Sequence, residues 1–203
     1  MTIIQKAFDQ INPRRSLLFV PAVRLEMLEK ALNSAADVVC IDLEDSVADS
    51  NKEIARTEAI SAILNTNNNQ KKHSKEIWIR INSIRSISGL EDVVALTKSD
   101  APPDGIMMPK ISSPEEVRIL RDIISEKHLD LNFHPLIETT KGLKKAFEIA
   151  KSSHKVGSVI FGGFDMAASL RVEPNWSGLL FAREQMVLAA ANAEIDLLDT
   201  PHF

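Results

Sequence analysis

Two carboxylates, Glu138 and Asp165, stand just after apolar runs of the sequence. Glu138 follows its run directly, and Asp165 comes after two glycines and a phenylalanine. If the two runs are neighbouring strands, the carboxylates converge, and two close carboxylates require a shared proton or a cation. Oxygen ligands combined with several waters suit Mg²⁺, so the pair predicts a Mg²⁺ site. The residues alone leave open an alternative, in which Glu138 forms a structural ion pair with Lys110 or Lys141.

Arg80 carries the opposite charge at the end of another apolar run. Arginine binds a carboxylate through two parallel hydrogen bonds, so Arg80 is a candidate clamp for an acidic substrate. Glu44 or Asp45 would then hold the guanidinium in place. A salt bridge with Glu44 that only ties two strands together is an equally good interpretation of these residues.

Three further residues have less specific interpretations. Gly162 and Gly163 either allow main-chain N–H groups to approach a ligand oxygen or form a tight turn. His134 stands early in its apolar run, where a hydrogen-bonded core histidine is the expected role. The other four histidines show no spacing typical of metal ligands.

The elements that must position these residues are short apolar runs alternating with helical patterns. Most runs are apolar on both faces, as expected of parallel strands covered on both sides. Strand–helix alternation predicts parallel strands joined by helical crossovers. The predicted strands are Leu17–Pro21, Val38–Leu43, Ile77–Ile81, Gly105–Pro109, Phe133–Ile137, Val156–Phe161 and Ile195–Leu198.

The order of these elements favours an α/β fold, a TIM (β/α) barrel, over a doubly wound sheet, because no Gly-rich dinucleotide turn follows the first strand. A closed barrel has eight strands, and the sequence predicts seven, so we expect a truncated barrel. It would form a single domain over residues 1–203, with 1–13 as an N-terminal extension. Its two open edges would be covered by residues 1–13 or by a neighbouring subunit. Active sites of such barrels lie at the C-terminal ends of the strands, where the polar residues of this sequence gather.

The composition limits the partners and the setting of the protein. The chain has 203 residues and a net charge of −4, which gives no reason to expect nucleic acid or an anionic membrane as partner. No apolar stretch approaches the roughly 20 residues of a membrane span, and the N-terminal stretch lacks the apolar core of a signal peptide. Cys40 is the single cysteine, so no intrachain disulfide forms and a cytoplasmic location is expected.

Six motifs of the sequence together resemble one protein family, the citrate lyase β-subunit-like branch of the HpcH/HpaI aldolase superfamily. The resemblance extends from about residue 14 to residue 201, with the motifs in the expected order. These motifs are RRSLLFVPA (14–22), VCIDLEDSVA (39–48), IRIN (79–82), DGIMMPK (104–110), LIETTKGL (136–143) and FGGFDMAASL (161–170).

The resemblance implies a Mg²⁺-dependent carbon–carbon lyase. Its substrate would be a small 3-hydroxy-dicarboxylyl-CoA such as citryl-, malyl- or citramalyl-CoA, cleaved to an acyl-CoA and an α-keto acid or formed by the reverse Claisen-type condensation. Glu138 and Asp165 would hold the metal, Arg80 and Glu44 would be catalytic, and Gly163, Phe164, Asp165, Glu138 and Arg80 would contact substrate. The family also implies a TIM barrel that assembles as a homotrimer or hexamer.

This sequence departs from the family pattern in three places. The first-strand motif FVPGDRP reads FVPAVRL here, in a loop that lies near CoA in relatives, and LIETARGL reads LIETTKGL. The segment that follows the seventh strand and supplies an acidic residue in several relatives has no counterpart, so no general base is assigned. Two alternatives follow: a metal-binding but catalytically weak subunit or scaffold, or a pyruvate-class aldolase that acts without CoA.

Overall fold

Seven parallel strands form one continuous sheet in the computed structural model, which describes residues 14–68, 75–100 and 102–201. The strands follow sequence order across the sheet, and every neighbouring pair is parallel. The strands are β1 (Leu17–Pro21), β2 (Val38–Asp42), β3 (Glu76–Arg80), β4 (Gly105–Met108), β5 (Asn132–Ile137), β6 (Ser158–Phe161) and β7 (Asp196–Leu198).

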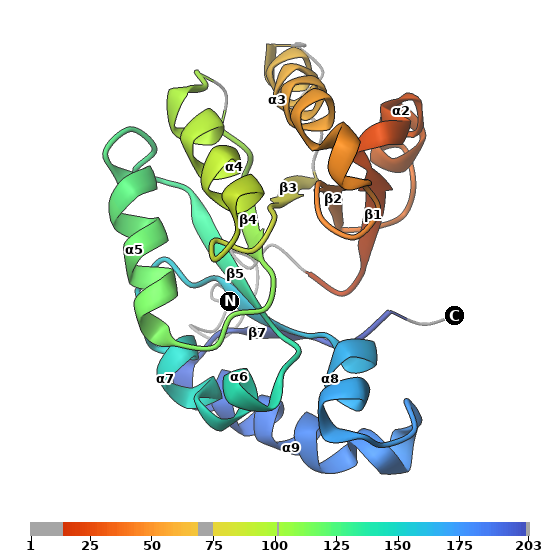
Figure 1. Cartoon of the computed structure of the whole chain (residues 1–203), viewed down its shortest axis with the longest axis vertical. Coiled ribbons are helices and arrows are strands. Elements are labelled where there is room, and N and C mark those ends of the chain that lie inside the picture. The colour runs from red at the N-terminus through yellow and green to blue at the C-terminus, as the bar shows by residue number, and fades with distance from the viewer. Residues whose placement is uncertain (1–13, 69–74, 101, 202–203) are drawn as a thin grey trace, which may run out of the picture.

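Helices cover the outside of this sheet, which curls so that β1 and β7 face an opening on one side (Figure 1). Helices α3, α4, α5, α7 and α9 pack against one another in that order. The helices are η1 (Ala22–Met27), α2 (Leu28–Leu32), η2 (Asp49–Asn51), α3 (Lys52–Asn68), α4 (Ile87–Lys98), α5 (Pro114–Ser125), α6 (Thr140–Lys144), α7 (Ala146–Ala150), α8 (Gly163–Leu170) and α9 (Trp176–Ala193).

This architecture confirms the prediction of a truncated (β/α) barrel. In the described part of the chain the sheet has seven strands, and β1 and β7 are its two edges. The expected N-terminal extension, residues 1–13, lies outside the described residues, and so does its proposed cover of the edges. No helix among the described residues combines the length and the apolar character needed to cross a membrane.

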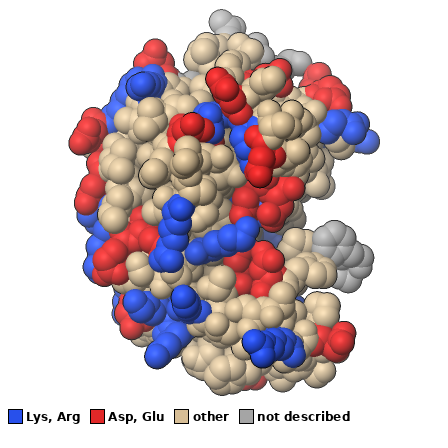
Figure 2. Space-filling view, viewed as in Figure 1, with Lys and Arg blue, Asp and Glu red and all other residues tan. Residues whose placement is uncertain are grey.

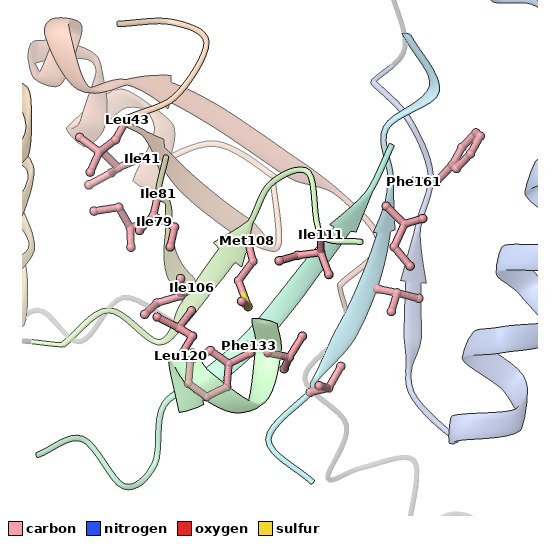
Figure 3. Packing of buried hydrophobic residues seen from close by; sticks show 14 of the residues in the cluster. Ile41, Leu43, Ile79, Ile81, Ile106, Met108, Ile111, Leu120, Phe133 and Phe161 are labelled. Carbon is pink, nitrogen blue, oxygen red and sulfur yellow. The ribbon is translucent and has the colours of Figure 1, made fainter. Parts of the chain in front are cut away.

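The core has two layers because successive residues of a strand point to opposite faces of the sheet. On the outer face, Ile41, Ile79, Ile106 and Phe133 pack beneath the helices (Figure 3). On the inner face, a smaller cluster fills the concave side of the sheet, and its members are Val38, Cys40, Trp78, Met107, Leu136, Ile160 and Leu198. This double burial explains why the strands read as apolar at nearly every position.

His134 lies on the inner face of the sheet and is fully buried, which confirms the prediction that it is a core histidine. Its ring stacks on Trp78 with a centroid separation of 3.5 Å, and its Nδ1 lies 2.8 Å from the Ser158 hydroxyl oxygen. Burial lowers the pKa of His134 well below its ordinary value. His134 is therefore a neutral packing residue.

Arg14 bridges the opening between β1 and β7 at the N-terminal edge of the strands. It lies just before β1, and its Nη1 donates to Asp196 of β7 at 3.0 Å and to the Gly157 carbonyl oxygen at 3.2 Å. Its Nε donates to Glu76 of β3 at 3.0 Å. One guanidinium thus links β1 with β7, although these two strands form no ladder with each other.

Replacing Arg14 with alanine is expected to lower the free energy of unfolding by about 2 kcal/mol, since it leaves a largely buried carboxylate of Glu76 without its charge partner. Arg15 provides a matched control: its side chain is 77% exposed and pairs with Asp37, so Arg15→Ala should change stability by less than about 1 kcal/mol. Urea unfolding of the two variants measures the difference. Equal losses would show that Arg14 has no special role at the opening.

Candidate active site

A cavity of about 690 Å³ opens on the concave side of the sheet. It extends along the opening past Leu17 and Phe19 of β1 and Leu198 of β7. In the space-filling view, acidic and basic side chains lie next to one another along the notch between the α2–α3 side and α8 (Figure 2). At the C-terminal edge of the strands the cavity is lined by Asp45, Arg80, Glu138, Gly163, Phe164 and Asp165.

Glu138 comes directly after β5 and is 3% exposed. Its Oε1 accepts a hydrogen bond of 2.7 Å from the main-chain N–H of Lys110. The carboxyl packs against Gly162, where an added Cβ would lie 2.5 Å from the Cβ of Glu138 and 2.8 Å from its Oε2. Glycine at position 162 therefore makes room for this carboxyl group.

Asp165 approaches Glu138 from the first turn of α8. Burial raises the pKa of Glu138 to about 8, and a hydrogen bond with the Asp165 side chain and the charge of Glu44 act in the same direction. The two carboxyl groups thus converge as the sequence predicts, and one of them holds a proton at neutral pH unless a cation replaces it.

The convergence of Glu138 and Asp165 fits a hard divalent cation that keeps waters of its own. In the described ranges, no three His, Cys, Asp or Glu side chains form a group that could hold a metal ion. Two protein oxygens with the remaining positions open are typical of Mg²⁺ sites.

Arg80 ends β3 and pairs chiefly with Asp42, its partner in the register of β2 and β3. Its Nε and Nη2 donate to the two carboxylate oxygens of Asp42, each at 2.7 Å. The Nη1 of Arg80 lies farther away, 3.1 Å from Glu44 and 3.5 Å from Asp45. The expected partners of Arg80, Glu44 and Asp45, are thus present, but Asp42 is its main partner and was not predicted.

The Asp42–Arg80 ion pair is largely buried, and its two hydrogen bonds fix the orientation of the guanidinium. Burial acts to raise the pKa of Asp42, but the hydrogen bonds and charge of Arg80 outweigh it, and the pKa stays below its ordinary value. Arg80 therefore ties β2 to β3, as the structural alternative proposed, and at the same time presents its guanidinium to the cavity.

Glu44 lies behind the lining of the cavity and contacts both cations of this edge. Its Oε1 accepts from the Lys110 ammonium at 2.6 Å, and its Oε2 lies beside Arg80. The ammonium of Lys52 fixes the loop by donating to the carbonyl oxygens of Leu43 at 2.8 Å and Glu44 at 2.5 Å. Burial raises the pKa of Glu44 above its ordinary value.

The alternative of a Lys110–Glu138 ion pair is not what the structure contains. Lys110 contacts Glu138 with its main-chain N–H, while its ammonium lies on Glu44. Among the described residues, no lysine or arginine nitrogen forms a salt bridge with Glu138.

Gly163 donates its N–H to the Thr200 hydroxyl oxygen at 3.1 Å, just past the end of β7. An added Cβ at Gly163 would lie 2.8 Å from that oxygen, so glycine here permits close approach of Thr200. Phe164 is half exposed at the cavity. Substrate contact by Gly163 and Phe164 stays a prediction, as do the catalytic roles of Arg80 and Glu44.

Three contacts at this site were not predicted from the residues. They are the pairing of Asp42 with Arg80, the main-chain hydrogen bond from Lys110 to Glu138, and the contact of Thr200 with Gly163. Strand register could have suggested Asp42 opposite Arg80, but the other two contacts leave no signal in residue spacing.

Comparison with known proteins gives one family. The family model described as HpcH/HpaI aldolase/citrate lyase matches residues 15–203. The mitochondrial citramalyl-CoA lyase of Homo sapiens is 30% identical over 203 residues, which cover 92% of this chain and 58% of that protein. The citrate lyase subunit beta of Escherichia coli K12 is 31% identical over 196 residues, which cover 92% of this chain and 63% of that protein. The chain thus spans less than two thirds of the length of these relatives.

Solved structures of CitE, the citrate lyase beta subunit of Mycobacterium tuberculosis, share the fold with a TM-score of 0.75 and 28% identity. One is a complex with magnesium, acetoacetate and coenzyme A, and the match covers 94% of this chain and 68% of that one. Another contains oxaloacetate and magnesium, with 95% and 82% covered. On the match of the family model to nearly its whole length, the chain belongs to the HpcH/HpaI aldolase/citrate lyase family.

Proposed function

We propose that this protein is a Mg²⁺-dependent carbon–carbon lyase, or catalyses the reverse Claisen-type condensation, on a small 3-hydroxy-dicarboxylyl-CoA. The names of its relatives support CoA-ester lyase chemistry. The observation that carries the proposal is the buried Glu138 beside Asp165, whose raised pKa marks a site in need of a cation. The products would be an acyl-CoA and an α-keto acid.

Glu138 and Asp165 would hold the metal ion through carboxylate oxygens. Bound there, Mg²⁺ would act as a Lewis acid toward the carbonyl and carboxylate oxygens of the keto acid. The magnesium complexes of CitE support this assignment. At the C-terminal edge of the strands, carboxylates outnumber cationic side chains, so a divalent cation also balances the local charge. The cations are Arg80 and Lys110, and the carboxylates are Asp42, Glu44, Asp45, Glu138 and Asp165.

Arg80 supplies the fixed positive charge for the reaction. In cleavage, a general base takes the proton of the substrate hydroxyl, whose oxygen becomes the carbonyl of the keto acid as the adjacent carbon–carbon bond breaks. The electron pair of that bond leaves as the enolate of the acyl-CoA, which then takes up a proton. Negative charge therefore develops on oxygen atoms at both ends of the breaking bond. A guanidinium held rigidly by Asp42 stabilises such charge without reorganising.

The affinity for Mg²⁺ is expected to rise about tenfold between pH 7 and pH 9. The metal binds the ionised carboxylate, and with a pKa of about 8 most Glu138 side chains are protonated below that pH. Binding at pH 7 should release close to one proton. Calorimetry in two buffers that differ in ionisation enthalpy measures both quantities, and a pH-independent affinity would contradict the raised pKa of Glu138.

Assembly and location remain part of the proposal. A homotrimer or hexamer and a cytoplasmic setting follow from the family resemblance and the single buried cysteine. The open edges of β1 and β7 support an oligomer, because exposed strand edges favour association. Sedimentation equilibrium tests the assembly.

The deciding experiment is calorimetric titration of oxaloacetate, and separately of acetyl-CoA, into the Mg²⁺-loaded protein. We expect both to bind, followed by turnover of a candidate hydroxy-acyl-CoA. Binding of oxaloacetate without acetyl-CoA would favour the CoA-independent aldolase, with the altered first-strand loop as the reason. Binding of both ligands without turnover would favour the catalytically weak subunit or scaffold.

A further inference from the structure

Lys110 has a main-chain conformation that needs an explanation. Its φ is +55°, in the left-handed region that is unfavourable for residues other than glycine and asparagine. The described residues with such a conformation are Lys110, Arg171 and Glu194, and the last two terminate helices α8 and α9, where it is ordinary. Lys110 instead follows β4 at the edge of the sheet that carries the candidate site.

The turn at Lys110 follows Pro109, whose ring fixes its own φ near −65°. In a turn where a positive φ follows proline, glycine or asparagine is the favoured residue. Residues other than glycine pay a conformational cost in this region, and residues that bear such a cost cluster at functional sites.

The main chain of Lys110 reaches one half of the site. The turn that contains this left-handed residue places the N–H of Lys110 2.7 Å from Oε1 of Glu138, to which it donates. Since Glu138 is almost fully buried and packs against Gly162 on its other side, this hydrogen bond determines how the carboxyl group faces Asp165. Hydrogen bonds to a ligating carboxylate are a usual means of orienting it.

The side chain of Lys110 reaches the other half. Its ammonium donates to Oε1 of Glu44 at 2.6 Å, and Oε2 of Glu44 lies 3.1 Å from Nη1 of Arg80. The contacts thus run without interruption from Asp42 through Arg80, Glu44 and Lys110 to Glu138. This chain of contacts joins the ends of β2, β3, β4 and β5.

We infer that Lys110 is a positioning residue that holds the Arg80 half of the site in register with the Glu138–Asp165 half, through its left-handed main chain on one side and its ammonium on the other. The inference rests on the proposed function for what the two halves bind. The two parts of the inference affect the binding of different ligands. The main chain of Lys110 affects the affinity for Mg²⁺, and its ammonium affects the affinity for the keto acid at Arg80.

Two substitutions separate the main-chain part from the ammonium. Lys110→Gly and Lys110→Val both remove the ammonium, but glycine adopts a positive φ freely and a β-branched residue strongly resists it. We expect Lys110→Gly to bind Mg²⁺ within about threefold of the wild type, and Lys110→Val to bind it at least about tenfold more weakly. Equal Mg²⁺ affinities of the two variants, measured by calorimetry, would overturn the main-chain part.

Glu194→Val is the matched control for strain, because Glu194 has a φ of +58° at the end of α9. It should lower the melting temperature as Lys110→Val does, without weakening Mg²⁺ binding. A similar loss of Mg²⁺ affinity in Glu194→Val would assign the effect to general destabilisation. If Lys110→Val does not fold, Lys110→Ala replaces it, with a smaller loss expected because alanine resists the conformation less.

The ammonium part is tested with oxaloacetate as the probe. Without Lys110 to share it, Glu44 pairs with Arg80 alone and competes with the ligand for the guanidinium. Lys110→Gly in the Mg²⁺-loaded state should therefore bind oxaloacetate about tenfold more weakly than the wild type, the size of one charge-assisted hydrogen bond. Unchanged oxaloacetate affinity would overturn this part.

Amide hydrogen exchange provides a readout that needs neither metal nor turnover. The Lys110 N–H should be protected in the metal-free wild type and should exchange faster in Glu138→Ala, which removes its acceptor. Equal exchange rates would overturn the contact itself. If the wild type binds no Mg²⁺ but the Lys110 amide is protected through Glu138, the proposed function fails while the positioning of Glu138 by Lys110 stands.

Discussion

Replacing Glu138 with glutamine is expected to weaken Mg²⁺ binding by at least about a hundredfold while the fold survives. The loss should be this large because the substitution alters a metal ligand itself, whereas removing a group that only hydrogen-bonds to a ligand costs about 10- to 100-fold. Glutamine has nearly the same shape, and its carbonyl oxygen can still accept the hydrogen bond from Lys110. It lacks the negative charge that a hard cation requires. Calorimetric titration of MgCl₂ into the variant measures the loss, with exposed Glu148→Gln on α7 as the control.

The same substitution is expected to stabilise the metal-free protein above pH 8. Burial raises the folded-state pKa of Glu138 from an ordinary 4.5 to about 8, so the protonated form is favoured in the folded state. Its contribution to stability is fully present below pH 4.5 and is lost as the pH rises through 8. The glutamine variant has no charge to bury at position 138, so its unfolding free energy should fall less than that of the wild type over this range.

Unfolding by urea at pH 5 and at pH 9, without metal, compares the two proteins. The wild type should lose more stability than the variant between these pH values, and added Mg²⁺ should restore the wild type alone. If the MgCl₂ isotherms of wild type and Glu138→Gln coincide, Glu138 is not a metal ligand. Parallel pH profiles would instead show that its carboxyl group ionises normally.

Replacing Arg80 with methionine is expected to reduce the free energy of unfolding by about 3–5 kcal/mol, because it leaves a buried carboxylate without its partner. Asp42 is 2% exposed and receives two hydrogen bonds of 2.7 Å from the guanidinium. The variant should also lose detectable oxaloacetate binding, since Arg80 provides the fixed cation of the cavity. Urea unfolding and calorimetry measure the two effects.

A second substitution separates the structural and the binding roles of Arg80. In Asp42→Asn/Arg80→Met both charges are gone, and replacing a whole buried ion pair is far less costly than breaking it. The double variant should recover most of the lost stability without recovering oxaloacetate binding. Recovery of binding together with stability would mean that Arg80 acts only as a tie between β2 and β3.

The wild-type arrangement explains how one arginine serves both purposes. Its Nε and Nη2 are committed to Asp42, while Nη1 makes only the longer contacts with Glu44 and Asp45. The pair fixes the plane of the guanidinium, and the remaining edge faces the cavity. Rigidity of this kind is what electrostatic stabilisation of a developing charge requires.

The sequence by itself was sufficient for the outline of the fold. Residues apolar on both faces of short runs predict strands covered on both sides, and their alternation with helices predicts parallel order. All seven predicted runs are strands of the sheet, with boundaries that differ by a few residues. The same reasoning brought Glu138 and Asp165 together, because parallel strands in sequence order place their C-terminal ends at one edge.

Only the tertiary structure decided which side chains meet within that edge. Asp42 became the main partner of Arg80 through strand register, which depends on how whole strands pack and not on the residues at their ends. Lys110 adopts a left-handed main-chain conformation that lysine disfavours. Thr200, just after β7, accepts a hydrogen bond from Gly163, which is distant in sequence. Arg14 joined β1 to β7 because the curl of the sheet brings its first and last strands near each other. Such contacts depend on how segments distant in sequence pack together in the folded sheet, which local residue patterns do not encode.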